Sequence, residues 1–244
     1  MNKTGMISAA FAASVFATAS VSLARGFGGD LDDVFVGIES GRLTTSRILD
    51  DGMGGFGGTE PYRVFPGEFG ETGFPGFADD PGYFSDGVLP EGLSLGFNIL
   101  DAARVWNGSD FDTVSLNTVT LGVALGLPGF PTAVTPTTAG EFVAGFPFAL
   151  TSEGGFMHQH LEMQLSDPDA TGVYLLQFEL YIADQRGSTA TLPYWFVMNN
   201  GADEAEHDAA IAYAESLVPA PGTGFMLLGG LVSVRRRRRA ASDR

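Results

Sequence analysis

The residues best suited to chemistry lie in one short segment, between Met157 and Leu165, where two of the chain's three histidines stand two positions apart. In a β-strand, alternate side chains point to the same face. A strand here would therefore gather four polar side chains on one side: His158, His160, Glu162 and Gln164. Imidazole and carboxylate groups together suit zinc, iron, manganese or copper. The spacing predicts a divalent transition metal site at His158, His160 and Glu162, to which His207 could add a third imidazole.

The same residues have two other interpretations. In the first, the strand presents a polar face, and its two histidines hydrogen-bond to neighbouring residues. In the second, the pair His158-x-His160 resembles part of the cupin motif, whose glutamate lies further along the chain than Glu162 does. That resemblance implies a cupin-like metalloenzyme, which would need a third ligand and an open coordination position.

Other features exclude several kinds of catalytic site. The chain has no cysteine, which excludes disulfides, zinc ribbons, iron–sulfur clusters and thiol nucleophiles. The glycine-rich stretch 54–58 lacks the lysine and hydroxyl residue of a phosphate-binding loop. Short acidic pairs such as Asp79-Asp80 lack the spacing of a calcium loop and are interpreted as surface turns. The sequence therefore contains no complete catalytic set.

The elements that must position the histidines are mainly short strands. The 244 residues include 34 glycines, 13 prolines and 20 phenylalanines, a composition typical of many turns around an aromatic core. Strand-like segments recur between turn signals, at 33–39, 42–45, 62–65, 93–99, 119–125, 144–150, 156–165, 173–182 and 193–198. The sequence predicts a mainly β fold, an antiparallel sandwich or jelly roll with long Gly/Phe-rich loops, notably 50–90.

One helix is predicted near the C-terminus, from Ala202 to Leu217. Four acidic residues fill its first turns, where the helix dipole favours negative charge. Ile211, Ala214 and Leu217 are the expected buried stripe. The helix completes a single β-rich domain over residues 25–217.

The charge of this domain excludes one class of partner. Residues 25–221 contain 28 acidic residues and six arginines, a formal net charge of −22. Such a surface repels phosphate backbones, so we expect no nucleic-acid partner.

The first 24 residues have the features of a secretory signal peptide. After Lys3 and Thr4, the 20 residues from Gly5 to Ala24 are uncharged, with small-x-small sites at 17–19 and 22–24. Cleavage after Ala19 and cleavage after Ala24 both fit, and either result predicts export.

The C-terminus, residues 218–241, has three parts. A proline motif comes first, made of Val218, Pro219, Ala220, Pro221 and Gly222. A short apolar segment follows, ending at Val234. Five consecutive arginines close it: Arg235, Arg236, Arg237, Arg238 and Arg239. The basic run is expected to stay on the cytoplasmic side of the membrane.

This tail resembles that of the PEP-CTERM proteins of Gram-negative bacteria, in the variant that carries Val-Pro-Ala-Pro-Gly. The resemblance implies an exosortase-type membrane protease as sorting partner. It also implies transient attachment to the inner membrane through the tail, followed by transfer to the cell surface or release outside the cell.

Three functions remain open from the sequence. The first is a non-catalytic structural or interaction protein of the envelope or extracellular matrix, with an extracellular polymer or envelope component as partner. The second is a divalent-metal-binding module that uses His158 and His160. The third is the cupin-like metalloenzyme.

Overall fold

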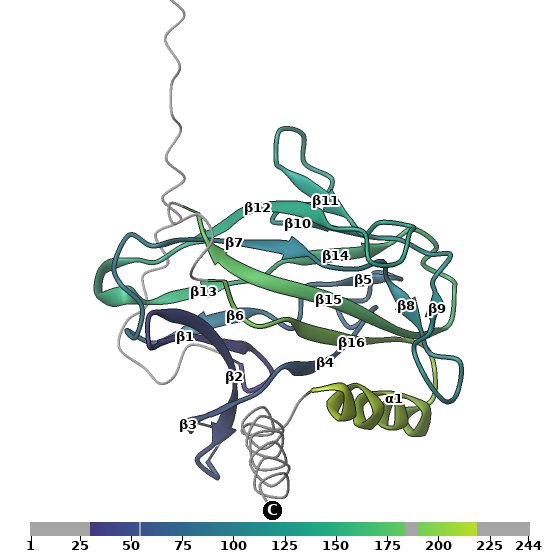
Figure 1. Ribbon diagram of the computed structural model, residues 1–244, viewed down its shortest axis with the longest axis horizontal. Coiled ribbons are helices and arrows are strands. Elements are labelled where there is room, and N and C mark those ends of the chain that lie inside the picture. The colour runs from purple at the N-terminus through teal and green to yellow at the C-terminus, as the bar shows by residue number, and fades with distance from the viewer. Residues whose placement is uncertain (1–29, 54, 184–189, 219–244) are drawn as a thin grey trace, which may run out of the picture.

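The computed structural model describes residues 30–53, 55–183 and 190–218. The predicted signal peptide and the predicted sorting tail beyond Val218 lie outside these residues. The described chain is mainly β and ends in an α-helix, which confirms the predicted fold class (Figure 1). No helix within the described ranges combines the length and apolarity needed to span a bilayer.

The strands form three sheets. The first has the order β13 (Met157–Gln159), β6 (Tyr83–Ser85), β1 (Val34–Glu39), β2 (Arg42–Asp50), β3 (Phe56–Pro61). The second has the order β11 (Thr132–Val134), β10 (Val119–Gly122), β14 (Glu162–Leu165), β5 (Phe77–Ala78). The third has the order β12 (Val143–Leu150), β7 (Ser94–Ile99), β15 (Gly172–Ile182), β16 (Tyr194–Asn200), β4 (Val64–Glu68), and β8 (Arg104–Val105) and β9 (Thr113–Val114) extend it beside β15.

Most strand pairs are antiparallel, as predicted. The β1–β2 hairpin turns at Ser40 and Gly41, whose φ angles of 52° and 80° are those of a type I′ turn. Two pairs are parallel instead, β1 with β6 and β16 with β4. In each pair the two strands are far apart in the sequence, so local sequence patterns do not reveal the pairing.

The region 50–90 is more ordered than predicted. Apart from a short strand at 62–65, which overlaps β4, we expected a long loop, and the structure also places β3, β5 and β6 there. Its phenylalanines do anchor it, because Phe65, Phe69 and Phe84 are buried. The abundant glycines therefore supply turns between short strands rather than one extended loop.

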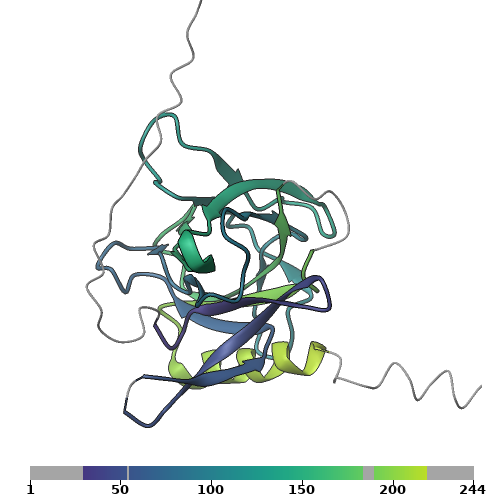
Figure 2. The same ribbon diagram turned by 90° about the vertical axis from the view of Figure 1, so that its left-hand side faces the viewer.

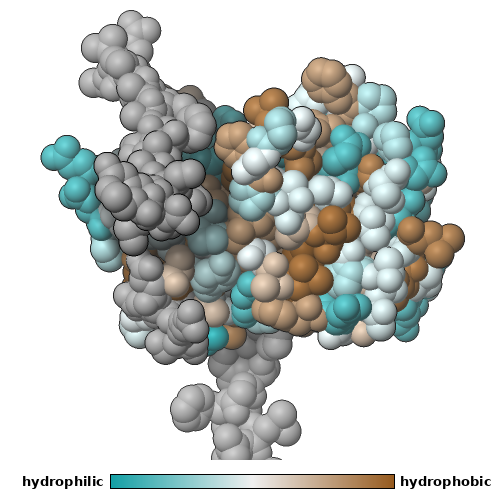
Figure 3. All heavy atoms as spheres, turned by 90° about the horizontal axis from the view of Figure 1, so that it is seen from above, coloured by the Kyte–Doolittle hydropathy of each residue, from teal (hydrophilic) through white to brown (hydrophobic). Residues whose placement is uncertain are grey.

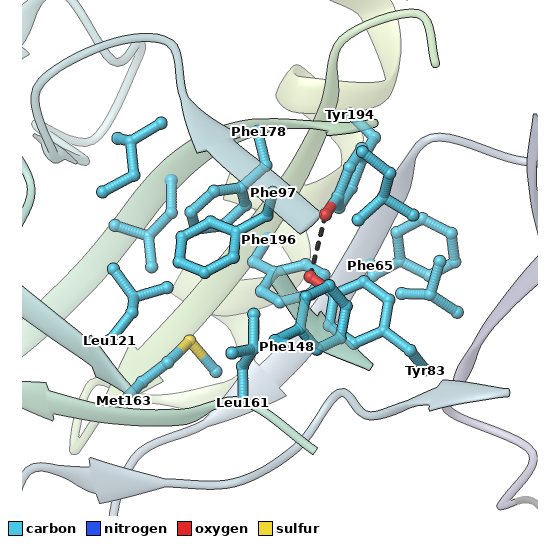
Figure 4. Packing of buried hydrophobic residues seen from close by; sticks show 14 of the residues in the cluster. Phe65, Tyr83, Phe97, Leu121, Phe148, Leu161, Met163, Phe178, Tyr194 and Phe196 are labelled. Carbon is cyan, nitrogen blue, oxygen red and sulfur yellow. Dashed lines mark hydrogen bonds between the residues drawn. The ribbon is translucent and has the colours of Figure 1, made fainter. Parts of the chain in front are cut away.

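An aromatic core joins the three sheets (Figure 4). The hydroxyl groups of Tyr83 and Tyr194 are 2.8 Å apart in its centre, so each phenol has a partner although both side chains are fully buried. Rings from the third sheet surround them: Phe97, Phe178 and Phe196. Fully burying one such side chain contributes about 1.5–3 kcal/mol, so this cluster holds the sheets together.

Helix α1 (Glu204–Leu217) packs outside the strands, against β16 and β4 (Figure 2). Asp203 caps it by accepting a hydrogen bond from the Glu206 backbone at 2.8 Å. Its buried residues are His207, Ala210 and Ala214. The predicted stripe was wrong at Leu217, which is 45% exposed. The small alanines let the helix lie close to the sheet, and this contact turns His207 inward.

The opposite face carries β12 and β11. Apolar residues gather at several places among hydrophilic ones on this face (Figure 3). Its exposed apolar side chains include Val134 and Leu150.

Candidate metal centre

The predicted strand 156–165 is interrupted after Gln159. Before the break, β13 pairs with β6 of the first sheet; after it, β14 pairs with β10 and β5 of the second. The inward alternation is as predicted, because Leu161, Met163 and Leu165 are buried. The continuity was wrong, and a chain that changes sheets cannot keep all its polar residues on one face.

Glu162 therefore does not join the two histidines. Its carboxylate accepts a hydrogen bond from the Leu125 backbone in the second sheet. The ligand atoms that do lie within 4.8 Å of one another belong to Asp33, His158 and His160. We call these three residues the His158 site.

The distances within the His158 site are short. The Nε2 atoms of His158 and His160 are 3.0 Å apart. Asp33 Oδ2 lies 3.2 Å from His158 Nε2. On its other side, the His160 ring places Nδ1 at 2.9 Å from the Asp79 carbonyl oxygen and 3.1 Å from Asp80 Oδ1. The acidic pair interpreted as a surface turn thus supports the site.

Strand register brings Asp33 to the histidines. Val34 of β1 and Gln159 of β13 lie opposite Tyr83 of β6, one on each side. One residue further, the same row runs from Asp33 through Gly82 to His160. Two strand spacings, about 9.5 Å, separate the outer backbones of this row. The two side chains must therefore converge above β6.

Gly82 makes this convergence possible. A Cβ atom at this position would overlap Asp33 Oδ1 and would come within 2.7 Å of His160 Cε1. The missing side chain leaves the space in which the carboxylate and the imidazole meet. The glycine is needed here for close approach, not for an unusual backbone angle.

The Asp33 carboxylate is fully buried. Its Oδ2 accepts a hydrogen bond from the Asp30 backbone at 3.0 Å and faces His158. Within the described part of the chain, its Oδ1 has no hydrogen-bond partner. A buried polar atom without a partner costs about 1–3 kcal/mol, and more when it is charged. One oxygen of the Asp33 carboxylate, Oδ1, is therefore uncompensated within the described chain, while the other faces His158.

Two groups of the site have shifted pKa values. The hydrogen bond to Asp33 raises the pKa of His158; partial burial opposes this shift, and the charge of Asp33 adds to it. Burial raises the pKa of Asp80, an effect that attraction to His160 opposes and repulsion from Asp79 and Asp33 reinforces. The carboxylates around the imidazoles thus contribute to both shifts, as the main cause for His158 and as a minor one for Asp80.

The hydrogen bonds define which nitrogen can bind a metal. His160 Nδ1 faces two acceptors and therefore carries the proton, which leaves a lone pair on Nε2. His158 Nε2 faces both that lone pair and Asp33 Oδ2, and one proton cannot satisfy both well. Loss of this proton would leave three lone pairs 3.0–3.2 Å apart along these two contacts. Such spacing suits neighbouring ligands of an ion with bonds of about 2.0–2.2 Å.

His207 lies in a different cluster, which corrects its predicted role. Its Nε2 is 3.0 Å from the Val197 carbonyl oxygen, and its potential ligand partners are Glu68 and Glu204. The helix packs on the third sheet, whereas the His158 pair belongs to the first. We call Glu68, Glu204 and His207 the His207 site.

Sequence reasoning missed three of these residues. The spacing Glu204-x-x-His207 was a usable signal, since residues three apart share one face of a helix. Asp33 and Glu68 gave no such signal, because only the pairing of distant strands brings them to the imidazoles.

Scans of protein-family models, curated proteins and solved structures found no significant match to this chain. The two sites are therefore interpreted from their own geometry.

Proposed function

We propose that this chain is an exported protein of the cell envelope or extracellular space whose β-rich body binds a divalent transition metal at the His158 site. One observation carries the metal assignment: two imidazole nitrogens converge with a fully buried carboxylate that has an oxygen without a partner among the described residues. Two imidazoles and one carboxylate suit zinc, iron, manganese or copper.

The alternative of a simple polar strand face explains the geometry less well. A satisfied polar face would give each buried polar atom a partner. Here one carboxylate oxygen lacks a partner in the described chain, and the single proton on His158 Nε2 faces two acceptors, His160 Nε2 and Asp33 Oδ2. A cation would satisfy all three groups at once, and the His160–Asp80 contact would hold one imidazole in the binding orientation.

The proposed role of the ion is structural. It would link the residue before β1 to the end of β13 across β6, joining segments more than 120 residues apart. Because the unfolded chain lacks the site, binding would stabilise the fold. The imidazoles are 27% and 31% exposed, so an external ligand could reach the ion. This exposure favours the cupin-like metalloenzyme as the second candidate function. Activity on a substrate panel would distinguish such an enzyme from a protein in which the ion is only structural.

Metal-dependent melting tests this proposal. For the wild type, zinc at 100 times its dissociation constant should add about 2.7 kcal/mol, or roughly 5–10 °C in melting temperature. His158→Ala combined with His160→Ala should abolish the shift. Glu162→Gln is the matched control, because it removes a carboxylate from the same segment outside the site and should keep the shift. An unchanged wild-type melting temperature with zinc, manganese, copper and iron(II) would reject the metal site.

Export is supported by the two ends of the chain and by the acidic body. In a host with an exosortase-type protease, mass spectrometry of the mature protein should find a start near Ser20 or Arg25 and no Arg235 to Arg239. The same protein could then engage an extracellular polymer or envelope component. Recovery of the intact tail from the cell surface would contradict the sorting proposal.

A further inference from the structure

The His207 site combines a helix turn with the end of a strand. Glu204 and His207 are three residues apart in the first turns of α1, so both side chains lie on one face. Glu68 is the last residue of β4, on which the helix packs. One ligand atom from each residue lies within 4.8 Å of the other two.

A hydrogen bond fixes the orientation of the His207 ring. Its side chain is 4% exposed, and its Nε2 must donate to the Val197 carbonyl oxygen, 3.0 Å away, because a carbonyl can only accept. The lone pair is therefore on Nδ1, and the described ring hydrogen bond of His207 is the one that Nε2 makes to Val197. Metal-binding histidines usually donate their second ring N–H to a carbonyl or carboxylate in this way.

The site opens into a hollow of about 390 Å³. Seven acidic residues line it: Asp30, Asp32, Glu68, Glu71, Asp80, Glu204 and Asp208. Among its described lining residues there is no lysine or arginine. Burial raises the pKa of Glu71, and repulsion from the charges of Glu68 and Asp80 raises it further. A cation here would meet strong attraction.

We propose that the His207 site binds a second divalent cation, for which manganese(II) is the appropriate probe. Two carboxylates and a hollow rich in oxygen favour a harder ion than the His158 site does, and the single imidazole favours a transition metal over calcium. The positive end of the α1 dipole opposes a cation, but the acidic residues of the first turn and of the hollow outweigh its half charge.

The acidic hollow also adjoins the His158 site. Asp80 lines the hollow and contacts His160, while Asp30 lines it and donates its backbone N–H to Asp33. Cations gathered in the hollow would therefore be close to both sites. The second site nevertheless has its own ligands and does not depend on the first.

The test removes the first site and leaves the second. In the variant carrying His158→Ala and His160→Ala, His207 is the only histidine of the chain. Its Hε1 and Hδ2 ring protons then give the only pair of histidine signals in NMR spectra, and substoichiometric manganese(II) should broaden those signals selectively. In the same background, the electron paramagnetic resonance signal of free manganese(II) should report one bound ion.

Matched pairs of changes then separate ligands from general charge. Glu68→Gln with Glu204→Gln should lower manganese(II) affinity at least about 100-fold. Loss of a residue that only supports a metal ligand costs up to about 100-fold, and loss of two ligands should cost no less. Glu71→Gln with Asp208→Asn removes the same charge from the same hollow and should cost less than about 10-fold.

Equal losses in the two pairs would overturn the proposal in favour of diffuse electrostatic attraction. If the His207 signals of the variant with only His158→Ala and His160→Ala stayed sharp with manganese(II), the proposal would also be overturned. This result does not require the Glu68 and Glu204 variants to fold. Because the background lacks the His158 site, these outcomes are independent of the proposed function.

Discussion

The two histidine clusters differ in what the fold buries. In the His158 site the carboxylate is fully buried, and the imidazoles are 27% and 31% exposed. In the His207 site the imidazole is 4% exposed, whereas its helix carboxylate, Glu204, faces solvent. Burying a charge costs far more than burying a neutral ring that has a hydrogen bond. The first site should therefore depend on a cation for stability, and the second should tolerate its absence.

The largest expected effect comes from Asp33→Asn. The amide keeps the shape of the side chain and removes the charge, so zinc affinity at the His158 site should fall by more than about 100-fold. The metal-free protein should lose little stability, because the change also removes a negative charge from a fully buried position. Calorimetric titration and thermal melting would measure both quantities.

Asp79→Asn is the control for this prediction. It removes the same charge next in line to Asp80, but Asp79 contacts His160 only through its backbone carbonyl. Zinc affinity should change little. A large loss of metal-free stability in Asp33→Asn, with zinc affinity kept, would show that Asp33 is a structural residue and not a ligand.

Gly82→Ala should have the next largest effect. The added methyl group overlaps Asp33 Oδ1 and crowds His160, so the ligands must separate and the fold should lose about 1–3 kcal/mol. Zinc binding at the His158 site should weaken, and manganese(II) binding at the His207 site should not.

Gly37→Ala in β1 is the matched control, since its new Cβ would approach Thr44 Oγ1 only to 3.3 Å. If the two alanine variants lost zinc affinity equally, the gap above β6 would not be what assembles the site.

The sequence predicted those parts of the molecule that local patterns determine. Alternation located most strands, and the Ser40-Gly41 turn located the first hairpin. The same logic paired His158 with His160, because residues two apart on a strand share a face. Acidic residues and the asparagine–glycine break located the helix to within two residues at its start.

Local patterns could not predict what pairs across the fold. Asp33 reaches His160 through a parallel pairing of β1 with β6, and nothing near Asp33 in the chain signals it. Glu162 was assigned wrongly because the change of sheet after Gln159 leaves alternation intact while turning the chain. Glu204-x-x-His207 could have been recognised by its helical spacing, but Glu68 could not.

The third prediction concerns pH and compares metal-free with zinc-bound protein. The pKa of His158 is raised in the fold, so its stabilising contribution is complete below its unfolded pKa of about 6.5 and is lost as pH rises through the folded value. Zinc requires the unprotonated ring, so its stabilisation grows over the same range. The two melting curves should separate as pH increases from 6 to 8.5.

Melting temperatures measured with a chelator and with zinc would show this separation. Between pH 6 and 8.5, loss of the His158–Asp33 interaction should lower the stability of the metal-free protein by less than about 1 kcal/mol, because water screens a partly exposed pair. His158→Ala should reduce this pH dependence of the metal-free protein. The same slope in wild type and in His158→Ala would assign the pH dependence to other groups.

The smallest expected effect is a stabilisation by Glu71→Gln. Burial, followed by repulsion from Glu68 and Asp80, raises the pKa of Glu71. A carboxyl group with a raised folded pKa binds its proton more tightly in the fold, so above its unfolded pKa its ionised form destabilises the protein. Removing the charge should therefore raise stability at pH 7, by less than about 0.5 kcal/mol because Glu71 lies at the surface.

Salt and metal should both reduce this gain. The Debye length shortens from about 30 Å at 0.01 M to about 8 Å at 0.15 M, which screens the acidic hollow. Manganese(II) in the His207 site would neutralise the same charges. Glu91→Gln, an exposed glutamate that is not among the residues lining the hollow, is the control and should show neither dependence. If Glu71→Gln stabilised the protein equally at all salt concentrations, its effect would come from desolvation alone, and the acidic hollow would lack the repulsion that a second cation is expected to relieve.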